Sequence, residues 1–181
     1  QLALKGHRHE VERHLALARA LGCEIRDEGL RLWPGRGARR FAAERLPGEV
    51  GARPPRIALG PGAGHPRRLW PIERFVELAG VLRVSHGATF VAVGGPDERA
   101  LGRALVGALG DAVVDLVGGA SVPQGAAALA RCDLFVGNDS GPMHLAAAAG
   151  IPVVELSCHP AGGDPGHANA PERFGPWGVP S

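Results

Sequence analysis

From residue 56 onward, short apolar runs alternate with segments in which apolar residues recur at helical spacing. Each apolar run ends in a turn rich in glycine or proline, as a buried strand does before a helix. This alternation predicts an α/β fold, a Rossmann-like parallel sheet with helices on both faces. The expected strands are 57–59, 89–93, 112–116, 133–137 and 152–156, and the expected helices begin near Pro71, Pro96, Pro123 and Pro142.

The first part of the chain does not continue this alternation. Its apolar residues are sparser and are separated by many charged side chains. Helical spacing of Val11, Leu15 and Ala18 indicates an amphipathic helix. A second helix is expected over 38–46, and the stretch 23–34 between the two leaves room for a strand.

The change of pattern predicts a division of the chain into two parts. Residues 47–55 are rich in glycine, proline and arginine, which is typical of a linker. We therefore expect residues 1–55 to be the tail of an earlier domain with an interdomain linker. Residues 56–181 are expected to form one Rossmann-like domain. Its last stretch, 160–181, is rich in glycine, proline and histidine, and it is expected to be loop-like and to stop without a capping helix.

Composition and charge exclude several classes of protein. A formal net charge of +2 with scattered arginines does not indicate a nucleic-acid-binding surface. Cys23, Cys132 and Cys158 are odd in number and widely spaced, so they indicate neither a disulfide framework nor a zinc site. No apolar run has the length that a transmembrane helix needs.

The strongest candidate site follows the fourth expected strand, where the chain reads Asn-Asp-Ser-Gly at 138–141. Asp139 or Ser140 can cap the following helix, and Gly150 suits its C-terminal end. Free backbone N–H groups and the helix dipole at such a corner favour an anion. His144 lies one turn after Ser140, so both can face the same ligand.

A second candidate is the loop 60–71, which follows the first expected strand. A glycine such as Gly62 lets the backbone approach a phosphate closely, and Arg67 or Arg68 could neutralise the phosphate. The loop matches neither a Walker sequence nor G-x-G-x-x-G, and it could equally be a loop with solvated arginines. Trp70 is expected to pack against the following helix.

A third candidate is the corner 94–98, which reads Gly-Gly-Pro-Asp-Glu. Acidic residues in the first turn of a helix interact favourably with its dipole, and this effect alone would explain Asp97 and Glu98. Alternatively, one of these carboxylates accepts a hydrogen bond from a ribose hydroxyl at the edge of a nucleotide pocket. The sequence leaves both interpretations open.

The chain also contains the residue types for two other kinds of chemistry, a hydrolase triad and a metal site. A hydrolase triad of Ser140, His144 and Asp139 is rejected because the sequence G-x-S-x-G is absent. His159, Asp164 and His167 form a loose polar group near the C-terminus, which could bind a metal or could be a solvated loop.

Three motifs resemble, in order, those of family 9 glycosyltransferases, the heptosyltransferase family of lipopolysaccharide synthesis. They are Arg-Leu-Trp-Pro at 68–71, Gly-Gly-Pro-Asp-Glu at 94–98 and Asp-Ser-Gly-Pro-Met-His at 139–144. The resemblance covers about residues 56–160. It implies a GT-B architecture of two Rossmann-like domains, of which residues 56–181 would be the C-terminal, nucleotide-sugar-binding domain and residues 1–55 the tail of the acceptor domain.

The resemblance also implies an activity. The donor would be a nucleotide sugar of the ADP-heptose kind, and the acceptor a glycan or lipid-linked glycan such as lipopolysaccharide. Transfer would proceed with inversion and without a metal or other cofactor, in the cytoplasm at the inner face of the bacterial inner membrane. The general base would lie in the N-terminal domain, so this chain would bind the donor.

Carried over residue by residue, the resemblance places Ser140 and Gly141 at the diphosphate and Glu98 at the ribose. Asp139 would contact the donor sugar, with His144 near the sugar or the phosphates. The expected catalytic residues are therefore Asp139, His144 and Arg68. The expected binding residues are Ser140, Gly141 and Glu98, together with Gly62 and Arg67 of the glycine-rich loop. No metal ligand is expected.

This sequence departs from the family pattern at two places. Arg68 stands where the family has lysine, which keeps the charge but changes its geometry. The chain reads Ser-Cys-His-Pro at 157–160, where the family usually has Gly-Pro-Thr-Asp-Pro, so the donor sugar could differ from heptose. A nucleotide-sugar epimerase of the same architecture and a non-catalytic nucleotide-binding domain are the alternative functions.

Overall fold

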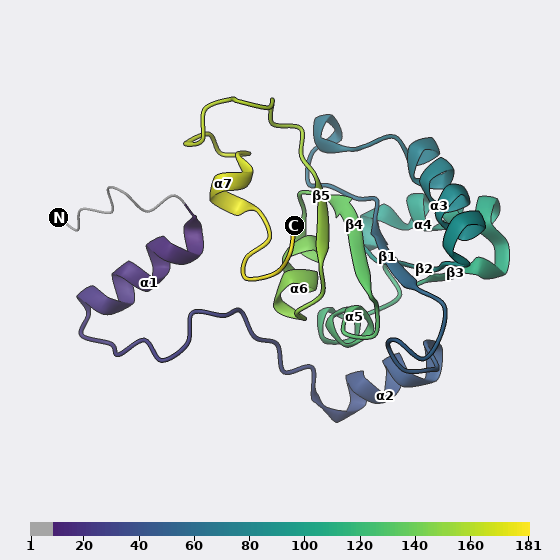
Figure 1. The fold of residues 1–181 in the computed structure, drawn as a ribbon, viewed down its shortest axis with the longest axis horizontal. Coiled ribbons are helices and arrows are strands. Elements are labelled where there is room, and N and C mark those ends of the chain that lie inside the picture. The colour runs from purple at the N-terminus through teal and green to yellow at the C-terminus, as the bar shows by residue number, and fades with distance from the viewer. Residues whose placement is uncertain (1–8) are drawn as a thin grey trace.

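The computed structural model describes residues 9–181 and contains a five-stranded, fully parallel sheet (Figure 1). Every predicted strand is present within one residue of its expected bounds. The predicted α/β fold class, a Rossmann-like sheet with helices on both faces, is therefore confirmed. The strands lie in the order β3-β2-β1-β4-β5, and they are β1 (Arg56–Gly60), β2 (Thr89–Ala92), β3 (Val113–Asp115), β4 (Leu134–Asn138) and β5 (Val153–Leu156).

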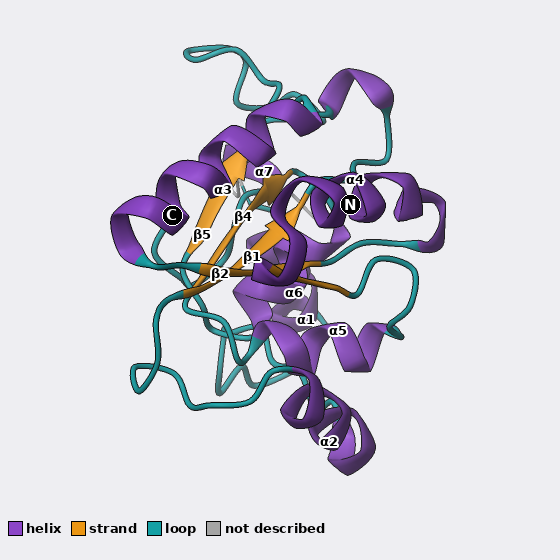
Figure 2. Ribbon diagram, turned by 90° about the vertical axis from the view of Figure 1, so that its right-hand side faces the viewer, coloured by secondary structure: helices purple, strands orange, loops and turns teal. Residues whose placement is uncertain are grey.

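Helices cover the sheet on both faces (Figure 2). Alternate residues of each strand point to opposite faces, so Phe90 and Val136 pack in one cluster and Val91 and Phe135 in the other. Burial on both faces explains why the strands are almost continuously apolar. The first cluster includes α3 (Ile72–His86) and α4 (Arg99–Leu109), and the second includes α2 (Gly35–Arg45), α5 (Val122–Leu129) and α6 (Gly141–Ala148).

The strand order reverses direction between β1 and β4, and that reversal determines where a ligand can bind. In open α/β sheets, ligands occupy the crevice beyond the carboxyl ends of the strands at this point. The short 3-10 helices η1 (Pro66–Arg68), η2 (Pro96–Glu98) and η3 (Gly110–Ala112) belong to the loops after β1, β2 and α4. The three predicted site motifs lie in the loops after β1, β2 and β4, at the same edge of the sheet.

The segment that connects α2 to β1 is hydrogen-bonded to the first residue of β1, at the amino-terminal edge of the sheet. The buried guanidinium of Arg56 donates to the carbonyl oxygens of Leu46, Pro47 and Arg131. Leu46 is also part of the core beside α5. The predicted division of the chain into two parts at residue 55 stays a prediction. However, Ala38 and Ala42 of α2, which precedes that boundary, belong to the core of the sheet domain.

One expectation about the first part of the chain was wrong. Residues 23–34 contain no strand, because their charged side chains are mostly solvated and Asp27 pairs locally with the Gly29 amide at 2.9 Å. Residues 160–181 are mostly loop, as expected, and contain one short helix, α7 (Pro171–Phe174), with Pro171 in its first turn. Residues 1–8 of the expected N-terminal part lie outside the described residues.

The N-terminal end of helix α1 (Glu10–Ala20) contacts the segment around α7 (Figure 1). The His9 side chain caps α1, and its Nε2 lies 3.0 Å from the carbonyl oxygen of Gly175. Its ring packs on Trp177, and Glu10 forms an ion pair with Arg173. No helix within residues 9–181 combines the length and the apolar character needed to cross a membrane.

Candidate functional site

The corner between β4 and α6 has the predicted strand–turn–helix form. Ser140 is the N-cap residue in an extended conformation, and Pro142 lies in the first turn of the helix. Gly150, with φ of 81°, ends the helix in the left-handed conformation that glycine favours. The Ser140 hydroxyl does not cap the helix: its oxygen is buried and has no hydrogen-bond partner among the described residues. A buried hydroxyl without a partner is costly, which points to a ligand.

Arg68 reaches this corner from η1. Its guanidinium lies 3.4 Å from a carboxylate oxygen of Asp139, and the two side chains are 34% and 12% exposed. The η1 turn is itself capped, because Nδ1 of His65 accepts the Arg67 amide at 3.1 Å. The loop after β1 therefore places a positive charge beside the N-terminus of α6, where both favour an anion.

Glu98 enters the same region from η2. Its carboxylate accepts the Gly95 amide at 2.7 Å. On the other side it lies against Gly62, where a Cβ atom would come within 1.8 Å of Glu98 Oε1. The absence of a side chain at Gly62 therefore makes room for this carboxylate, which remains half-buried with an oxygen free to accept another hydrogen bond.

The sequence did not indicate the residue that joins these loops. Asn138 is fully buried at the end of β4, and its Oδ1 accepts the Trp70 amide at 3.0 Å. Its Nδ2 donates to the carbonyl oxygens of Pro61, at 2.8 Å, and Gly62. Asn138 thus fastens the loop after β1 to the carboxyl end of β4. Trp70 packs edge-on against Phe75, as predicted.

His144 lies on α6 one turn beyond Ser140. Burial lowers the pKa of its imidazole, the Asp139 carboxylate opposes this, and His9 lowers it further. The imidazole is therefore mainly neutral at pH 7, and it can offer a hydrogen bond rather than a positive charge.

A cavity of about 460 Å³ brings most of the predicted residues together. A second cavity of about 520 Å³ shares the lining residues Gly64 and Glu98 with it and includes Gly62. We call the two together the donor pocket, after the nucleotide-sugar donor that the resemblance implies. Arg67 does not line it, although Arg68 does. The predicted residues at the first cavity are Arg68, Glu98, Asp139, Ser140, Gly141 and His144.

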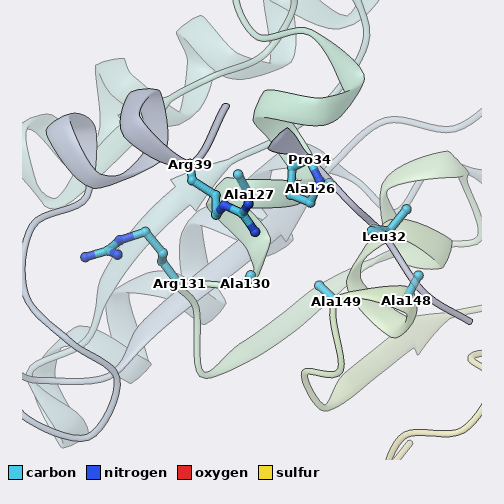
Figure 3. Close-up of a pocket in the computed structure, with 9 residues that line it drawn as sticks. All are labelled: Leu32, Pro34, Arg39, Ala126, Ala127, Ala130, Arg131, Ala148 and Ala149. Atoms are coloured by element: carbon cyan, nitrogen blue, oxygen red, sulfur yellow. The ribbon is translucent and has the colours of Figure 1, made fainter. Parts of the chain in front are cut away.

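Two other places on the molecule differ from the donor pocket. The residues that Figure 3 labels line a cavity of about 360 Å³. This cavity is bordered by alanines in α5 and α6 and just after these helices, together with Arg39 and Arg131. It lies away from the loops that follow the strands and holds no buried unpaired hydroxyl. His159 and His167 stack with ring centroids 5.5 Å apart, and residues 9–181 contain no group of His, Cys, Asp or Glu arranged to hold a metal ion.

Glu155, at the end of β5, is a half-buried carboxyl group that the sequence did not single out. Burial raises its pKa to about 7, and the nearby carboxylates of Asp139 and Glu172 add to the effect. The unfolded carboxyl ionises near 4.5, so between these values only the folded protein keeps the proton.

Consequently, we expect the Glu155 carboxyl to cost stability as pH rises from 5 to 8. Glu155→Gln should raise the free energy of unfolding at pH 8 by about 1–2 kcal/mol, a value reduced for partial solvation, and have little effect at pH 5. Denaturant unfolding at both pH values checks this, with the exposed Glu49→Gln as control. Equal effects of Glu155→Gln at the two pH values would contradict it.

Comparison with known proteins identifies the family. The sequence profile of glycosyltransferase family 9 (heptosyltransferase) matches residues 2–159. Lipopolysaccharide heptosyltransferase 2 of Escherichia coli K12 is 30% identical over 158 residues, which is 81% of this chain and 44% of that protein. The chain therefore spans less than half the length of this relative.

Two solved structures resemble the chain. A family 9 glycosyltransferase of Veillonella parvula matches 99% of the chain and 49% of its own length, with a TM-score of 0.80 and 27% identity. The ADP-heptose lipopolysaccharide heptosyltransferase II of E. coli matches 81% of the chain and 42% of its own length, with a TM-score of 0.63 and 26% identity. This chain belongs to glycosyltransferase family 9, the heptosyltransferase family.

Proposed function

We propose that this chain binds the sugar donor in a reaction that transfers heptose from ADP-heptose to a lipopolysaccharide acceptor. Family membership and the named activity of the E. coli relative support the reaction class. The buried, unpartnered hydroxyl of Ser140 at the N-terminus of α6 is the observation that carries the proposal. A diphosphate is the part of the donor that such a position suits best.

The diphosphate would lie between α6 and η1. There the Ser140 hydroxyl, the first backbone amides of α6 and the Arg68 guanidinium converge on one cavity. A diphosphate oxygen would give the Ser140 hydroxyl the partner it lacks, and Arg68 would neutralise charge from the side opposite the helix. These fixed groups can hold a diphosphate without a metal.

The nucleoside would extend from this point toward η2. Glu98 would accept a hydrogen bond from the ribose, since it lines both parts of the donor pocket. Beyond Gly95, a mostly apolar slot of about 170 Å³ lies among the loop after β2, α5 and α6. A flat base fits such a slot. Its apolar walls include Val93, Leu116 and Leu145.

The donor sugar would lie on the other side of the diphosphate, beside Asp139 and His144. The Asp139 carboxylate can accept hydrogen bonds from sugar hydroxyls, and the neutral imidazole of His144 can donate one or accept one. Arg68 contacts Asp139, so the same pair would position both the sugar and the phosphate next to it.

In the reaction, an acceptor hydroxyl oxygen attacks the anomeric carbon from the face opposite the diphosphate. The bond between that carbon and the phosphate oxygen breaks, and the configuration inverts. The hydroxyl proton goes to a base that we place outside this chain, in the acceptor-binding part of the enzyme. Negative charge grows on the departing ADP, where Ser140, Arg68 and the α6 amides stabilise it. A lipid-linked acceptor would bring the reaction to the cytoplasmic face of the inner membrane.

Replacement of Ser140 by alanine separates ligand binding from stability. We expect ADP affinity to fall about tenfold, as for loss of one hydrogen bond to a charged group. Stability should not fall, because the variant removes a buried hydroxyl that has no hydrogen-bond partner among residues 9–181. Calorimetric titration and thermal unfolding measure the two effects, with the exposed Ser85→Ala as control. A loss of stability without loss of affinity would contradict the assignment.

The proposed function is tested by calorimetry of the chain with ADP, UDP and GDP in the presence of EDTA. Preference for ADP, and binding of ADP-heptose without release of an altered free sugar, supports a heptosyltransferase donor site. Preference for UDP or GDP would contradict the assigned donor. Appearance of a sugar epimer would favour the epimerase alternative, and absence of all binding would contradict the assignment of a nucleotide site to this chain.

A further inference from the structure

One wall of the donor pocket carries an aromatic ring that the sequence motifs leave unassigned. Phe174, at the end of α7, lines the cavity that holds Asp139 and His144, together with Ala168. The family profile ends at residue 159, so this wall lies beyond the stretch that it matches. Ala168 contributes only a methyl group, and Phe174 therefore provides most of the apolar surface that the C-terminal segment gives to the cavity.

The helix α7, which carries Phe174, is fastened on both sides. Before it, Ala170 is fully buried, and its carbonyl oxygen accepts the Phe174 amide at 3.2 Å. After it, the chain returns to the sheet, where the carbonyl oxygen of Pro180 accepts the Val153 amide at the start of β5, at 3.0 Å (Figure 1). The wall is thus held in place by the protein, and a ligand would not have to order it.

The ring of Phe174 is half-buried, and the protein covers part of it. The guanidinium of Arg173 lies over the ring, 4.9 Å from its centroid. Arg173 is itself fixed by the ion pair with Glu10 and by a hydrogen bond to the carbonyl oxygen of Gly166. The part of the ring that lines the cavity offers apolar surface and no hydrogen bond, so it suits an apolar part of a ligand.

The position of Phe174 indicates which part of a nucleotide sugar it would meet. It does not line the second cavity of the donor pocket, and it does not line the apolar slot that suits the base. A diphosphate gains nothing from an apolar ring, and its proposed place is at Ser140 and Arg68. The sugar is the remaining part of the donor, and Phe174 lines the same cavity as Asp139 and His144, where we place it.

The chemistry of a pyranose matches such a combination of walls. Hydroxyl groups project from the rim of a pyranose ring, whereas its C–H groups form apolar faces. A binding site for it therefore needs hydrogen-bonding groups for the rim and apolar surface for a face. Asp139 and His144 would serve the hydroxyl groups, and Phe174 would cover a C–H face.

We propose that Phe174 is a specificity-determining residue for the donor sugar, and that its ring packs on the C–H face of a pyranose linked to the diphosphate. The ligand class is a nucleoside diphosphate pyranose. This inference rests on the proposed function, because it takes the donor sugar to lie beside Asp139. It adds the C-terminal segment to the donor pocket and makes Phe174 matter for the sugar and not for the nucleotide.

The test is calorimetric titration of the whole chain with ADP and with ADP-heptose. Phe174→Ala should lower the affinity for ADP-heptose about tenfold and change the affinity for ADP less than about twofold. Phe174→Leu keeps a large apolar side chain in α7 and should lower the affinity for ADP-heptose about threefold. The control is Val84→Ala, at an exposed apolar position on α3, which should change neither affinity.

NMR checks the contact itself. The ring protons of Phe174 are identified by the loss of their signals in Phe174→Leu. In the unaltered chain saturated with ADP-heptose, we expect nuclear Overhauser effects between these ring protons and C–H protons of the sugar. Effects between the ring and the adenine protons instead would overturn the assignment.

The affinities can overturn it as well. Equal losses of affinity for ADP and ADP-heptose, or unchanged affinity for both, would show that Phe174 does not recognise the sugar. If Phe174→Ala does not fold, the same comparison is made with Phe174→Leu. If the unaltered chain binds neither ligand, the proposed function fails together with this inference. If it binds ADP and the Phe174 variants keep full affinity for ADP-heptose, this inference fails alone.

Discussion

Replacing Gly62 by alanine is expected to weaken ADP binding by at least about tenfold, because the new methyl group would occupy the position of the Glu98 carboxylate. A Cβ atom at Gly62 would come within 1.8 Å of Glu98 Oε1 and 1.9 Å of its Cδ. The Glu98 side chain must then move, which breaks its hydrogen bond with the Gly95 amide and removes the acceptor assigned to the ribose. The backbone at Gly62 needs no left-handed conformation, so the effect is one of space alone.

Gly107 offers a control on α4, outside the donor pocket. Nothing lies within 4 Å of a Cβ atom built there, and its φ is not positive. Gly107→Ala should therefore keep wild-type ADP affinity and should not lower stability. Calorimetric titration of both variants with ADP provides the comparison. Similar affinities for Gly62→Ala and Gly107→Ala would remove Glu98 from the donor pocket.

The second large effect is expected at Asn138. Asn138→Ala removes the partner of the Trp70 amide and of the Pro61 carbonyl and leaves a cavity in a fully buried place. We expect a loss of about 3 kcal/mol in the free energy of unfolding, since buried backbone groups would remain unpaired. ADP affinity should fall as well, because the loop that carries Arg68 would lose its attachment to β4.

Guanidinium unfolding measures the first effect and calorimetry the second. Asn169→Ala is the control, since the Asn169 side chain makes no hydrogen bond among residues 9–181 and lies outside the sheet. It should change stability by less than about 0.5 kcal/mol. A stability of Asn138→Ala close to that of the unaltered chain would show that Asn138 does not hold the loop.

The strands and the site corners could be predicted because their signals are local. Each buried strand is a short apolar run that ends at glycine or proline, and each corner places its polar residues beside a strand end. The parallel α/β topology then brings the loops after β1, β2 and β4 to one edge. That is why the sequence alone predicts a set of residues, Arg68, Glu98, Asp139, Ser140 and His144, that lines one cavity in the structure.

The remaining features depend on contacts between distant segments. The sequence places Asn138 in the corner after β4 but does not reveal its role, which follows from the approach of residues 61–70 to the end of that strand. Arg67 and Arg68 are neighbours in sequence, yet only Arg68 lines the cavity that holds Asp139 and Ser140. The raised pKa of Glu155 arises from burial and from the carboxylates of Asp139 and Glu172, which no spacing along the chain reveals.

We propose above all that the loops after β1, β2 and β4 together bind the nucleotide part of a sugar donor. The most direct test is to follow the backbone amide signals of the chain by NMR as ADP is added. We expect shifts at Gly62 and Gly95 in two of the loops and at Gly141 at the start of α6, and none at Ala148 and Ala149 beside the cavity of Figure 3. Shifts at Ala148 and Ala149 with unchanged signals at the three glycines would contradict it.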